Sequence, residues 1–451
     1  MRPASEAQTV GAIRLAARRL TDDGGSDALM ELIGDAHVVL LGEASHGSHE
    51  FYAERARITQ RLIVEKGFHA VAVEGDWPDA YRVNRFVRGL GDAASAESAL
   101  NGFQRFPSWM WRNTVVVEFI TWLRTVNDRR PEAARCGFYG LDLYSMHASM
   151  DAVLRYLDQE HPDLAALTRE RYACFDRFGD DSQVYGLMTG LRGVEACRDG
   201  VMATLVDLRR RAAQTTARRD TASGHDSAED RFDAEQNARL VKNAEAYYRS
   251  MYLSDVSSWN QRDQHMAETL EALQRHLARH TEPPKLVVWA HNSHLGDARA
   301  TEMGQQRGEL NVGQLVRERH GQDAVLVGFT THGGSVTAAS DWGGRAQRMQ
   351  IVRSRPDSIE GLMHAAGIAR FVLPLRPGGR HVDALRDARL ERAIGVIYRP
   401  ETERQSHYFF AQLPQQFDAL VHIDTTRALE PLERDARGGD AEAPETYPSG
   451  V

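Results

Sequence analysis

Short apolar runs recur along this chain, and helical stretches separate many of them. Each run is apolar at nearly every position rather than at alternate positions, which is typical of strands covered on both faces of a sheet. The runs span residues 37–41, 70–74, 136–141, 286–290, 324–328, 370–375, 393–398 and 419–424. This pattern predicts an α/β fold: a three-layer α/β/α core with a mostly parallel sheet and a large helical insertion.

Residues 49–67, "HEFYAERARITQRLIVEKG", predict one of the connecting helices. Gly67 is expected to end it as the first residue beyond the helix, where a left-handed backbone is common.

The strand pattern is absent between residues 146 and 283, where the periodicity indicates helices. We therefore expect the N-terminal half of the core in 1–145, a helical insertion in 146–283 that could act as a lid, and the C-terminal half in 284–430. Residues 214–233 are polar and predict a mobile loop, and residues 431–451 predict a disordered tail.

The composition is ordinary for a globular protein, with 42% hydrophobic and 26% charged residues among 451 and a net charge of −8. This charge argues against a nucleic-acid or anionic-membrane partner. The amino-terminal residues lack the apolar segment of a signal peptide, and no run approaches the roughly 18 apolar residues of a membrane span. We expect a cytoplasmic protein, and the oligomeric state stays open.

Cys136, Cys174 and Cys197 are widely spaced and include no CxxC pair. This spacing argues against a disulfide framework and against a cysteine zinc site. We expect three small buried side chains in a reducing compartment.

Acidic residues and histidines occur where the predicted strands end. They are Glu43 and His46, Glu74, Asp142, and His291 and His294. The carboxyl ends of parallel strands lie along one edge of a sheet, where α/β proteins bind ligands. We therefore expect these side chains to meet in one crevice.

Each residue also has a purely structural interpretation. His46 could cap the following helix, Glu74 could pair with a buried arginine, and Asp142 could form a turn. One of His291 and His294 could hold its loop while the other faces the crevice.

Three kinds of chemistry fit such a crevice. Ser45 invites comparison with the G-x-S-x-G nucleophile elbow, but Glu43 occupies the first glycine position. A divalent metal could be bound by Glu43, His46, Glu74, His291 and His294, although no H-E-x-x-H motif is present.

In the third kind, His46 removes a proton from water while Glu43 or Glu74 orients its imidazole. A second histidine would polarise the carbonyl or protonate the leaving oxygen, and Arg55 and Arg262 could stabilise the developing negative charge.

Aromatic residues could line an apolar cleft for a large ligand. The candidates are Trp77, Trp109, Trp111 and Trp259. Ordinary core packing is the alternative interpretation for each.

Several segments together resemble the erythromycin esterase family over roughly residues 10–430. They include "LLGEASHGSHEFYAERARITQRLI", "VAVEGDWPDAYRVN", "FYGLDLYS", "WNQRDQHMAETL" and "VVWAHNSHLGDARATEM". The resemblance implies an α/β core with a helical insertion. It also implies a hydrolase, since the macrolide-resistance members of the family cleave the lactone of erythromycin-type antibiotics.

The resemblance implies roles for individual residues. The base is His46 with Glu43 beside it, and Glu74, His291 and His294 complete the centre. Arg55 and Arg262 correspond to substrate or transition-state contacts. A histidine base that activates water forms no acyl-enzyme, and we expect neither a metal nor another cofactor.

The expected partner is a small-molecule ester or lactone. Two alternatives remain: a metal-dependent hydrolase built on the same Glu/His cluster, and a binding protein without turnover.

Overall fold

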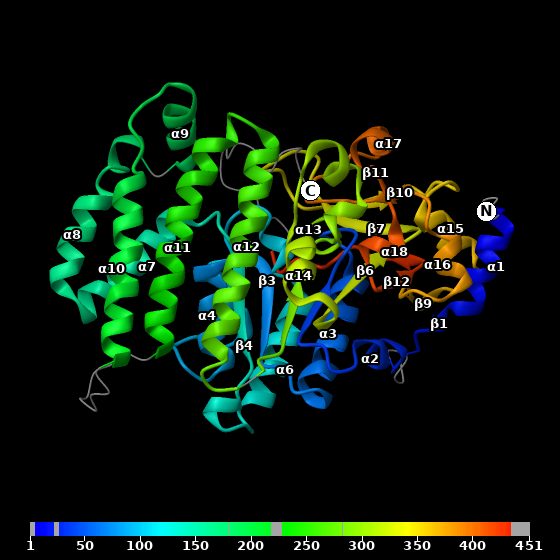
Figure 1. Ribbon diagram of the computed structural model, residues 1–451, viewed down its shortest axis with the longest axis horizontal. Coiled ribbons are helices and arrows are strands. Elements are labelled where there is room, and N and C mark those ends of the chain that lie inside the picture. Colours follow the sequence, from blue (N-terminus) through cyan, green and yellow to red (C-terminus); the bar gives the residue numbers. More distant parts are fainter. Residues whose placement is uncertain (1–4, 22–26, 180, 218–227, 282, 434–451) are drawn as a thin grey trace.

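The computed structural model describes residues 5–21, 27–179, 181–217, 228–281 and 283–433. Its centre is an 8-stranded sheet with the order β1-β9-β12-β6-β2-β5-β3-β4 (Figure 1). The strands are β1 (Arg18–Arg19), β2 (Val38–Leu41), β3 (Ala70–Asp76), β4 (Gly137–Asp142), β5 (Leu286–Trp289), β6 (Ala324–Thr330), β9 (Arg370–Pro374) and β12 (Ala419–Ile423). The six strands from β12 to β4 are parallel to one another. β9 runs antiparallel to β12, and β1 pairs antiparallel with β9, so β1 has the same direction as the six. The predicted fold class is confirmed.

The strand order brings distant segments together. β5 pairs with β2 on one side and with β3 on the other, and its partners run parallel to it. Residues that follow β5 in the chain therefore emerge between the residues that follow β2 and those at the end of β3. This position in a parallel sheet is where crevices form.

Helices cover both faces of the sheet. In β2, Val38 and Leu40 belong to one buried cluster and Val39 and Leu41 to the other. One cluster includes residues of α2 (Asp27–Ile33), α3 (His49–Glu65) and α6 (Thr114–Asn127). The other includes residues of α1 (Glu6–Ala16), α14 (Val312–His320), α15 (Ile359–Ala365) and the helical insertion. This arrangement explains why the strands are apolar throughout rather than alternating.

The ends of α3 follow from its sequence. Helical backbone stops at Glu65, Lys66 is the cap, and Gly67 follows with a φ of 68°. Glycine adopts this left-handed conformation without the steric cost of a Cβ atom. The predicted helix end at Gly67 agrees with the structure.

The chain between β4 and β5 is helical, as predicted. Its helices are α7 (Met146–Glu160), α8 (Pro162–Tyr172), α9 (Ser182–Gly186), α10 (Arg198–Ala217), α11 (Ala228–Met251) and α12 (Asp255–Leu277). In Figure 1, α7, α8, α10 and α11 form a bundle at one end of the molecule, while α12 lies closer to the sheet.

Parts of the predicted loop and tail fall outside the described residues. Of the loop predicted at 214–233, the ends belong to α10 and α11, and residues 218–227 are outside. Of the tail predicted at 431–451, residues 431–433 are described. There the amide of Leu432 donates to Arg112 O and Glu433 forms an ion pair with the Arg112 side chain.

The run at 393–398 is not a regular strand, so this prediction is wrong. Its residues are buried, but they form only isolated bridges, Ile394 with Ser45 and Ile397 with Ala339. Its neighbours form smaller sheets from β7 (Gly333–Ala338), β8 (Gln347–Ile351), β10 (Arg389–Arg392), β11 (Tyr408–Ala411) and β13 (Thr425–Thr426). An apolar run predicts that its residues are buried. To form a strand it must also hydrogen-bond to a neighbouring strand along its length.

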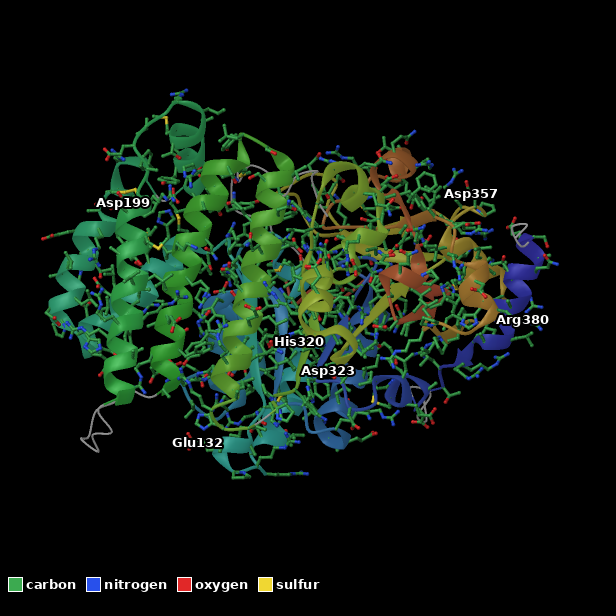
Figure 2. The ribbon with its side chains drawn as sticks, in the orientation of Figure 1. Glu132, Asp199, His320, Asp323, Asp357 and Arg380 are labelled. Atoms are coloured by element: carbon green, nitrogen blue, oxygen red, sulfur yellow. A yellow bond between two sulfur atoms is a disulfide. The ribbon has the colours of Figure 1, made fainter. Side chains whose placement is uncertain are left out.

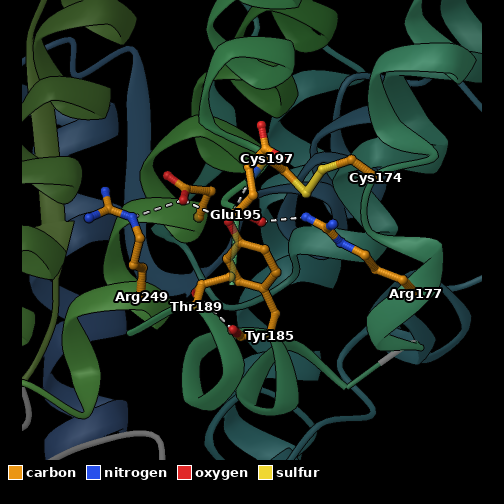
Figure 3. Close-up of a disulfide and its surroundings, with 8 residues drawn as sticks. Cys174, Arg177, Tyr185, Thr189, Glu195, Cys197 and Arg249 are labelled. Atoms are coloured by element: carbon orange, nitrogen blue, oxygen red, sulfur yellow. Dashed lines mark hydrogen bonds and ion pairs between the residues drawn. A yellow bond between two sulfur atoms is a disulfide. The ribbon is translucent and has the colours of Figure 1, made fainter. Parts of the chain in front are cut away.

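The prediction of three unpaired cysteines is wrong for two of them. Cys174, just after α8, forms a disulfide with Cys197, just before α10, and their Cα atoms lie 5.8 Å apart (Figure 3). A separation of 23 residues in the sequence does not indicate that two cysteines are bonded. The packing of α8 against α10 brings Cys174 and Cys197 together. Cys136 is free and buried, as expected. Cysteine usage therefore gives no support to a reducing compartment.

Charged side chains such as those of Glu132, Asp199 and Asp357 are exposed and lie at the periphery (Figure 2). None of the helices in the described ranges has both the length and the apolar composition needed to span a bilayer.

Candidate active site

The loop after β2 places Glu43 and His46 at the carboxyl edge of the sheet. Gly47 lies against β7, where its carbonyl accepts a hydrogen bond from Thr337 N at 2.9 Å. A Cβ atom at position 47 would collide with the Thr337 backbone, so glycine is required for this close approach. The contact with Thr337 fixes the loop two residues before α3, which begins at His49.

Glu43 joins His46 to Arg55. Glu43 Oε1 lies 3.0 Å from His46 Nδ1, and Oε2 accepts a hydrogen bond from Arg55 Nη2 at 2.6 Å. The three residues are 1%, 3% and 0% exposed. The Arg55 guanidinium also lies over the rings of Tyr52 and Trp289. Arg55 therefore fixes the carboxylate, and the carboxylate fixes the orientation of the imidazole.

The other ring nitrogen of His46 is available. Because Nδ1 faces a carboxylate, Nδ1 carries the proton in the neutral ring and Nε2 carries the lone pair. His46 Nε2 forms no hydrogen bond with any residue that the structure describes, and His46 lines a cavity. This arrangement suits a base that accepts a proton from a bound water.

Glu74 lies in β3 beside the residues that follow β5. Its Oε1 accepts a hydrogen bond from Arg262 Nη2 at 2.8 Å, and its Oε2 accepts one from the backbone N–H of His291 at 2.8 Å. Burial alone would raise the pKa of Glu74, but the charges of His294, His46 and Arg262 outweigh burial and hold this pKa well below its ordinary value. Glu74 therefore contributes a fixed negative charge.

Arg262, on α12, binds Asp142 at the end of β4 through two hydrogen bonds. Nε donates to Oδ1 at 3.0 Å and Nη2 to Oδ2 at 2.6 Å. Burial acts to lower the pKa of Arg262, but the charges of Asp142 and Glu74 raise it well above its ordinary value. The guanidinium lies over the Tyr144 ring, 5.0 Å from its centroid. This planar bidentate pair holds α12 to the sheet edge.

His294 is enclosed by acidic groups. Its Nδ1 lies 2.9 Å from Asp263 Oδ2, and its Nε2 lies 3.3 Å from Glu74 Oε1. Burial lowers the pKa of His294, but the charges of Asp263 and Glu74 exceed this effect and raise it to about 9. Arg262 Nη1, at 3.0 Å from Nε2, opposes the rise. Its ring stacks on Trp259 with centroids 4.5 Å apart.

His291 has a different environment. Its Nδ1 accepts a hydrogen bond from the backbone N–H of Ser293 at 3.2 Å, so the ring proton resides on Nε2. Burial and the charge of His46 hold the pKa of His291 well below its ordinary value. Nε2 is buried without a partner among the described residues, and the ring centroid lies 4.8 Å from that of His46. His291 is therefore a neutral ring beside the candidate base, and the Ala44 backbone near its ring opposes the fall in its pKa.

A cavity of about 90 Å³ adjoins these groups. It is lined by His46, Glu74, Gly75, Asp76, Asp79, Phe103, Arg105, Phe106, Pro107, Met110, Trp111, Asp142, Tyr144, Arg262, Trp342 and Val396. Pockets for drug-sized ligands usually have roughly 300–1,000 Å³. The described conformation therefore holds water or a small group rather than a large ligand.

Two further carboxyl groups line this cavity. Burial, followed by the neighbouring charge of Asp142, raises the pKa of Asp76 to about 6 despite Arg105. Burial and the charge of Asp76 raise the pKa of Asp79 to about 7. Arg105 Nη1 lies 3.7 Å from Asp76 Oδ2. This wall of the cavity can therefore hold or release protons near neutral pH.

The structure brings most of the predicted site residues together. Glu43, His46, Glu74, Asp142, Arg262, His291 and His294 form one buried cluster. Arg55 contacts this cluster through its ion pair with Glu43 and does not line the cavity.

Only one of the tryptophans predicted as cleft residues lines the cavity. Trp111 does so, and its Nε1 donates to Glu74 O at 3.1 Å. Trp77 instead packs between the sheet and α11, where its Nε1 donates to Asp233 Oδ1 at 2.8 Å. Trp109 packs on Phe106 behind the cavity wall. Trp259, the fourth candidate, is half-buried and stacks on His294 outside the lining of this cavity.

Sequence reasoning missed Asp263, Asp76 and Asp79. Asp263 directly follows Arg262, so it could have been named as a further charged residue of the same helix near the site. Asp76 and Asp79 follow Glu74 in "VEGDWPD" and could have been identified as further residues of the same strand end.

Ser45 does not fit the nucleophile alternative. Its Oγ shares a hydrogen bond with Ser48 Oγ at 2.5 Å, and it does not line the cavity.

The side chains considered as metal ligands are engaged with arginines, with Asp263 and with each other. Within the described part of the chain, no group of three or more His, Cys, Asp or Glu side chains is arranged to hold a metal ion.

The chain matches the family model of erythromycin esterase over residues 63–426. The protein belongs to the erythromycin esterase family. The matched range contains Glu74, Arg262 and both histidines of "WAHNSH", and it begins after Glu43, His46 and Arg55. Family membership supports a hydrolase.

Erythromycin esterase type II of Escherichia coli is 23% identical over 433 residues, which cover 91% of this chain and 94% of the relative. Among solved structures, a Bacillus cereus protein matches with a TM-score of 0.75 at 19% identity, covering 96% of this chain and 100% of the other. A histidine-to-asparagine mutant of the erythromycin esterase EreC in its open conformation matches with a TM-score of 0.65 at 17% identity, covering 91% and 97%. These structural likenesses show the fold shared by this erythromycin esterase family member.

Proposed function

We propose that this protein hydrolyses a carboxylic ester and that His46 is the base that removes a proton from water. The observation that carries the proposal is the buried Glu43–His46 pair at 3.0 Å, with Nε2 left unbonded on a ring that lines a cavity. Family membership favours the same reaction class.

The proposed reaction needs no covalent acyl-enzyme. Water forms a bond to the ester carbonyl carbon while its proton moves to His46 Nε2. The tetrahedral intermediate then breaks its bond to the leaving oxygen, which takes the proton back from His46. The products are a carboxylic acid and an alcohol. Glu43 and Glu74 stabilise the imidazolium that exists between the two steps.

His291 is the proposed donor to the oxyanion. Its low pKa keeps the ring neutral around pH 7, and its ring lies beside that of His46. His291 is fully buried outside the cavity lining, so its Nε2–H reaches the oxyanion only in a wider conformation of the site. A preorganised donor of this kind contributes roughly 10²–10³ in rate. Arg262 supplies a fixed positive charge on the cavity wall, and its contacts with Asp142 and Glu74 hold it in place.

We propose a lactone or related ester as the substrate, with erythromycin-type macrolides as the first candidates. A relative named erythromycin esterase type II supports this choice. A cavity of about 90 Å³ is too small for such a ring, so the substrate requires a wider conformation. The related EreC structure was determined in an open conformation.

The experiment is mass spectrometry of a macrolide and ester panel after incubation with the protein, in search of ring-opened products heavier by one water from the lactones and of the separate acid and alcohol from the acyclic esters. We expect His46→Ala to abolish turnover, since a positioned base contributes roughly 10²–10⁴ in rate. His49→Ala, in the same segment but outside the cavity lining, is the matched control and should keep activity. Turnover by His46→Ala at the wild-type rate would reject the mechanism.

A parallel measurement tests the metal-dependent alternative. We expect activity to survive chelation and dialysis, with no stoichiometric metal by elemental analysis. Loss of activity on chelation, restored by one added metal, would favour the alternative.

A further inference from the structure

A second cavity lies beside the histidines that follow β5. Its volume is about 350 Å³, larger than that of the His46 cavity, and the two share no lining residue. Its walls come from α12, from the segment 293–311, and from the region of α17 (Glu403–Ser406) and β11. The proposed esterase reaction uses none of this space.

Two lining side chains touch the buried histidines directly. The Trp259 ring stacks on the His294 ring, with centroids 4.5 Å apart and planes 9° apart. Ser293 Oγ lies 2.8 Å from His291 Nδ1. The cavity is therefore one side chain away from the catalytic centre.

One wall of this second cavity is apolar and is formed by side chains that can adapt to a ligand. It includes the half-buried rings or chains of Trp259 and Met303, together with Tyr408 and Phe409. Met303 begins a π-helix, Met303–Arg307, a type of turn that is rare and frequently found at functional sites. Methionine and aromatic rings adapt to flat apolar groups, and aromatic faces attract cations.

The polar side of the cavity has an unbalanced negative charge. Glu302 is half-buried and forms no ion pair or side-chain hydrogen bond with any residue in the described ranges. The nearby Arg307 is already paired with Glu309, with Nε and Oε1 3.3 Å apart. A carboxylate left unpaired at a partly buried position is stabilised by a cationic ligand.

We propose that this second cavity binds a small organic cation, namely a protonated amine attached to a flat apolar group. The ammonium pairs with Glu302, and the apolar group packs against Trp259 and Met303. A bound ligand therefore contacts Trp259, whose ring also stacks on His294.

The test uses two probes that differ only in charge. Tryptamine carries an indole ring and an ammonium, and tryptophol carries the same ring and a hydroxyl. Isothermal titration calorimetry of the full chain should give tighter binding for tryptamine. Glu302→Gln should weaken tryptamine binding about tenfold and leave tryptophol binding unchanged, because the substitution removes the charge that pairs with the ammonium and the hydroxyl probe has no such charge.

Two further variants complete the test. Met303→Trp fills the cavity and should abolish binding of both probes, while Glu401→Gln, an exposed carboxylate outside this cavity, should change neither. Equal affinity for the two probes, no binding to the wild type, or retained binding by Met303→Trp would overturn the proposal. Calorimetry needs no ester turnover, so failure here is distinct from failure of the proposed hydrolysis.

Discussion

Arg262 and His294 each contact more than one buried acidic group, and this sharing sets the electrostatics of the site. Arg262 binds both Asp142 and Glu74, and His294 lies between Glu74 and Asp263. Removing one member of such a network leaves the others with uncompensated buried charge, which costs roughly 3–5 kcal/mol. Conservative changes are therefore the informative ones.

Asp263→Asn should change the pH dependence of hydrolysis. The charge of Asp263 helps to raise the pKa of His294 to about 9, so its loss should lower that pKa. The charge of His294 lies 3.3 Å from Glu74, which stabilises the His46 imidazolium, so we expect activity to fall as His294 loses its proton and the alkaline limb of kcat/KM to move down by about one pH unit. Asp263→Glu should restore the wild-type profile. An unchanged profile in Asp263→Asn would show that the charge of His294 is irrelevant to the reaction.

Asp79→Asn should stabilise the protein at alkaline pH. The pKa of Asp79 is raised to about 7 by burial and by Asp76, so the folded state binds this proton more tightly than the unfolded chain. Stability is therefore lost as pH rises from about 4 through 7. The full pKa difference corresponds to about 4 kcal/mol, and solvent screening of this half-buried side chain reduces it, so the variant should gain about 2 kcal/mol at pH 8 and little at pH 4.

Urea unfolding at the two pH values measures this difference, with the exposed Asp92→Asn as the control. An equal effect of Asp79→Asn at pH 4 and pH 8 would contradict the assignment.

At the scale of elements, the start of α6 supports the cavity wall. Asn113 is fully buried; its Oδ1 accepts from Val116 N at 2.9 Å, and its Nδ2 donates to Trp109 O and Met110 O. One side chain thus caps α6 and closes the turn that carries Trp111. The wall beside Glu74 therefore depends on this cap.

Asn113→Ala should cost about 2–3 kcal/mol, because the cap contributes about 1 kcal/mol and the two carbonyls lose buried partners. Urea unfolding measures the cost. Ser358→Ala removes another buried helix cap, on α15 away from the cavity, and should cost about 1 kcal/mol. A cost for Asn113→Ala no larger than that of the control would argue that the carbonyls find other partners.

At the scale of the whole molecule, the helical insertion belongs to the site. α12 supplies Arg262 and Asp263, so an insertion that moved as one lid would carry these charges of the candidate site with it. Glu229 at the start of α11 ties the insertion to the core through Arg88, which follows α4, at 2.9 Å, and it joins α11 to α12 through His276 at 2.9 Å. We propose that α11 and α12 stay fixed on the core.

Glu229→Gln should loosen this attachment. Burial would raise the pKa of Glu229, but His276 and Arg88 outweigh it and lower the pKa to about 2. The pairs therefore stabilise the fold above pH 4.5, and this contribution is lost as pH falls towards 2. We expect a loss of about 3 kcal/mol at pH 7 in urea unfolding.

The difference between wild type and Glu229→Gln should shrink between pH 5 and pH 3. The control is Glu65→Gln, in an exposed pair with Arg61, where the loss should stay below about 1 kcal/mol. A pH-independent difference would argue that Glu229 acts by packing alone.

The sequence by itself determined most strands of the central sheet, their mostly parallel arrangement and the residue types at their ends. Glu43, His46, Glu74 and Asp142 could be predicted because an apolar run and the polar residue that follows it are neighbours in the chain. The end of α3 at Gly67 was predictable for the same local reason.

Only the tertiary structure decided which distant residues meet. The insertion of β5 between β2 and β3 places His291 beside His46, and the packing of α12 on the sheet edge brings Asp263 to His294. The Cys174–Cys197 pair likewise depends on how α8 and α10 pack. Strand order and helix packing result from burial summed over the whole chain, so no local pattern of residues records them.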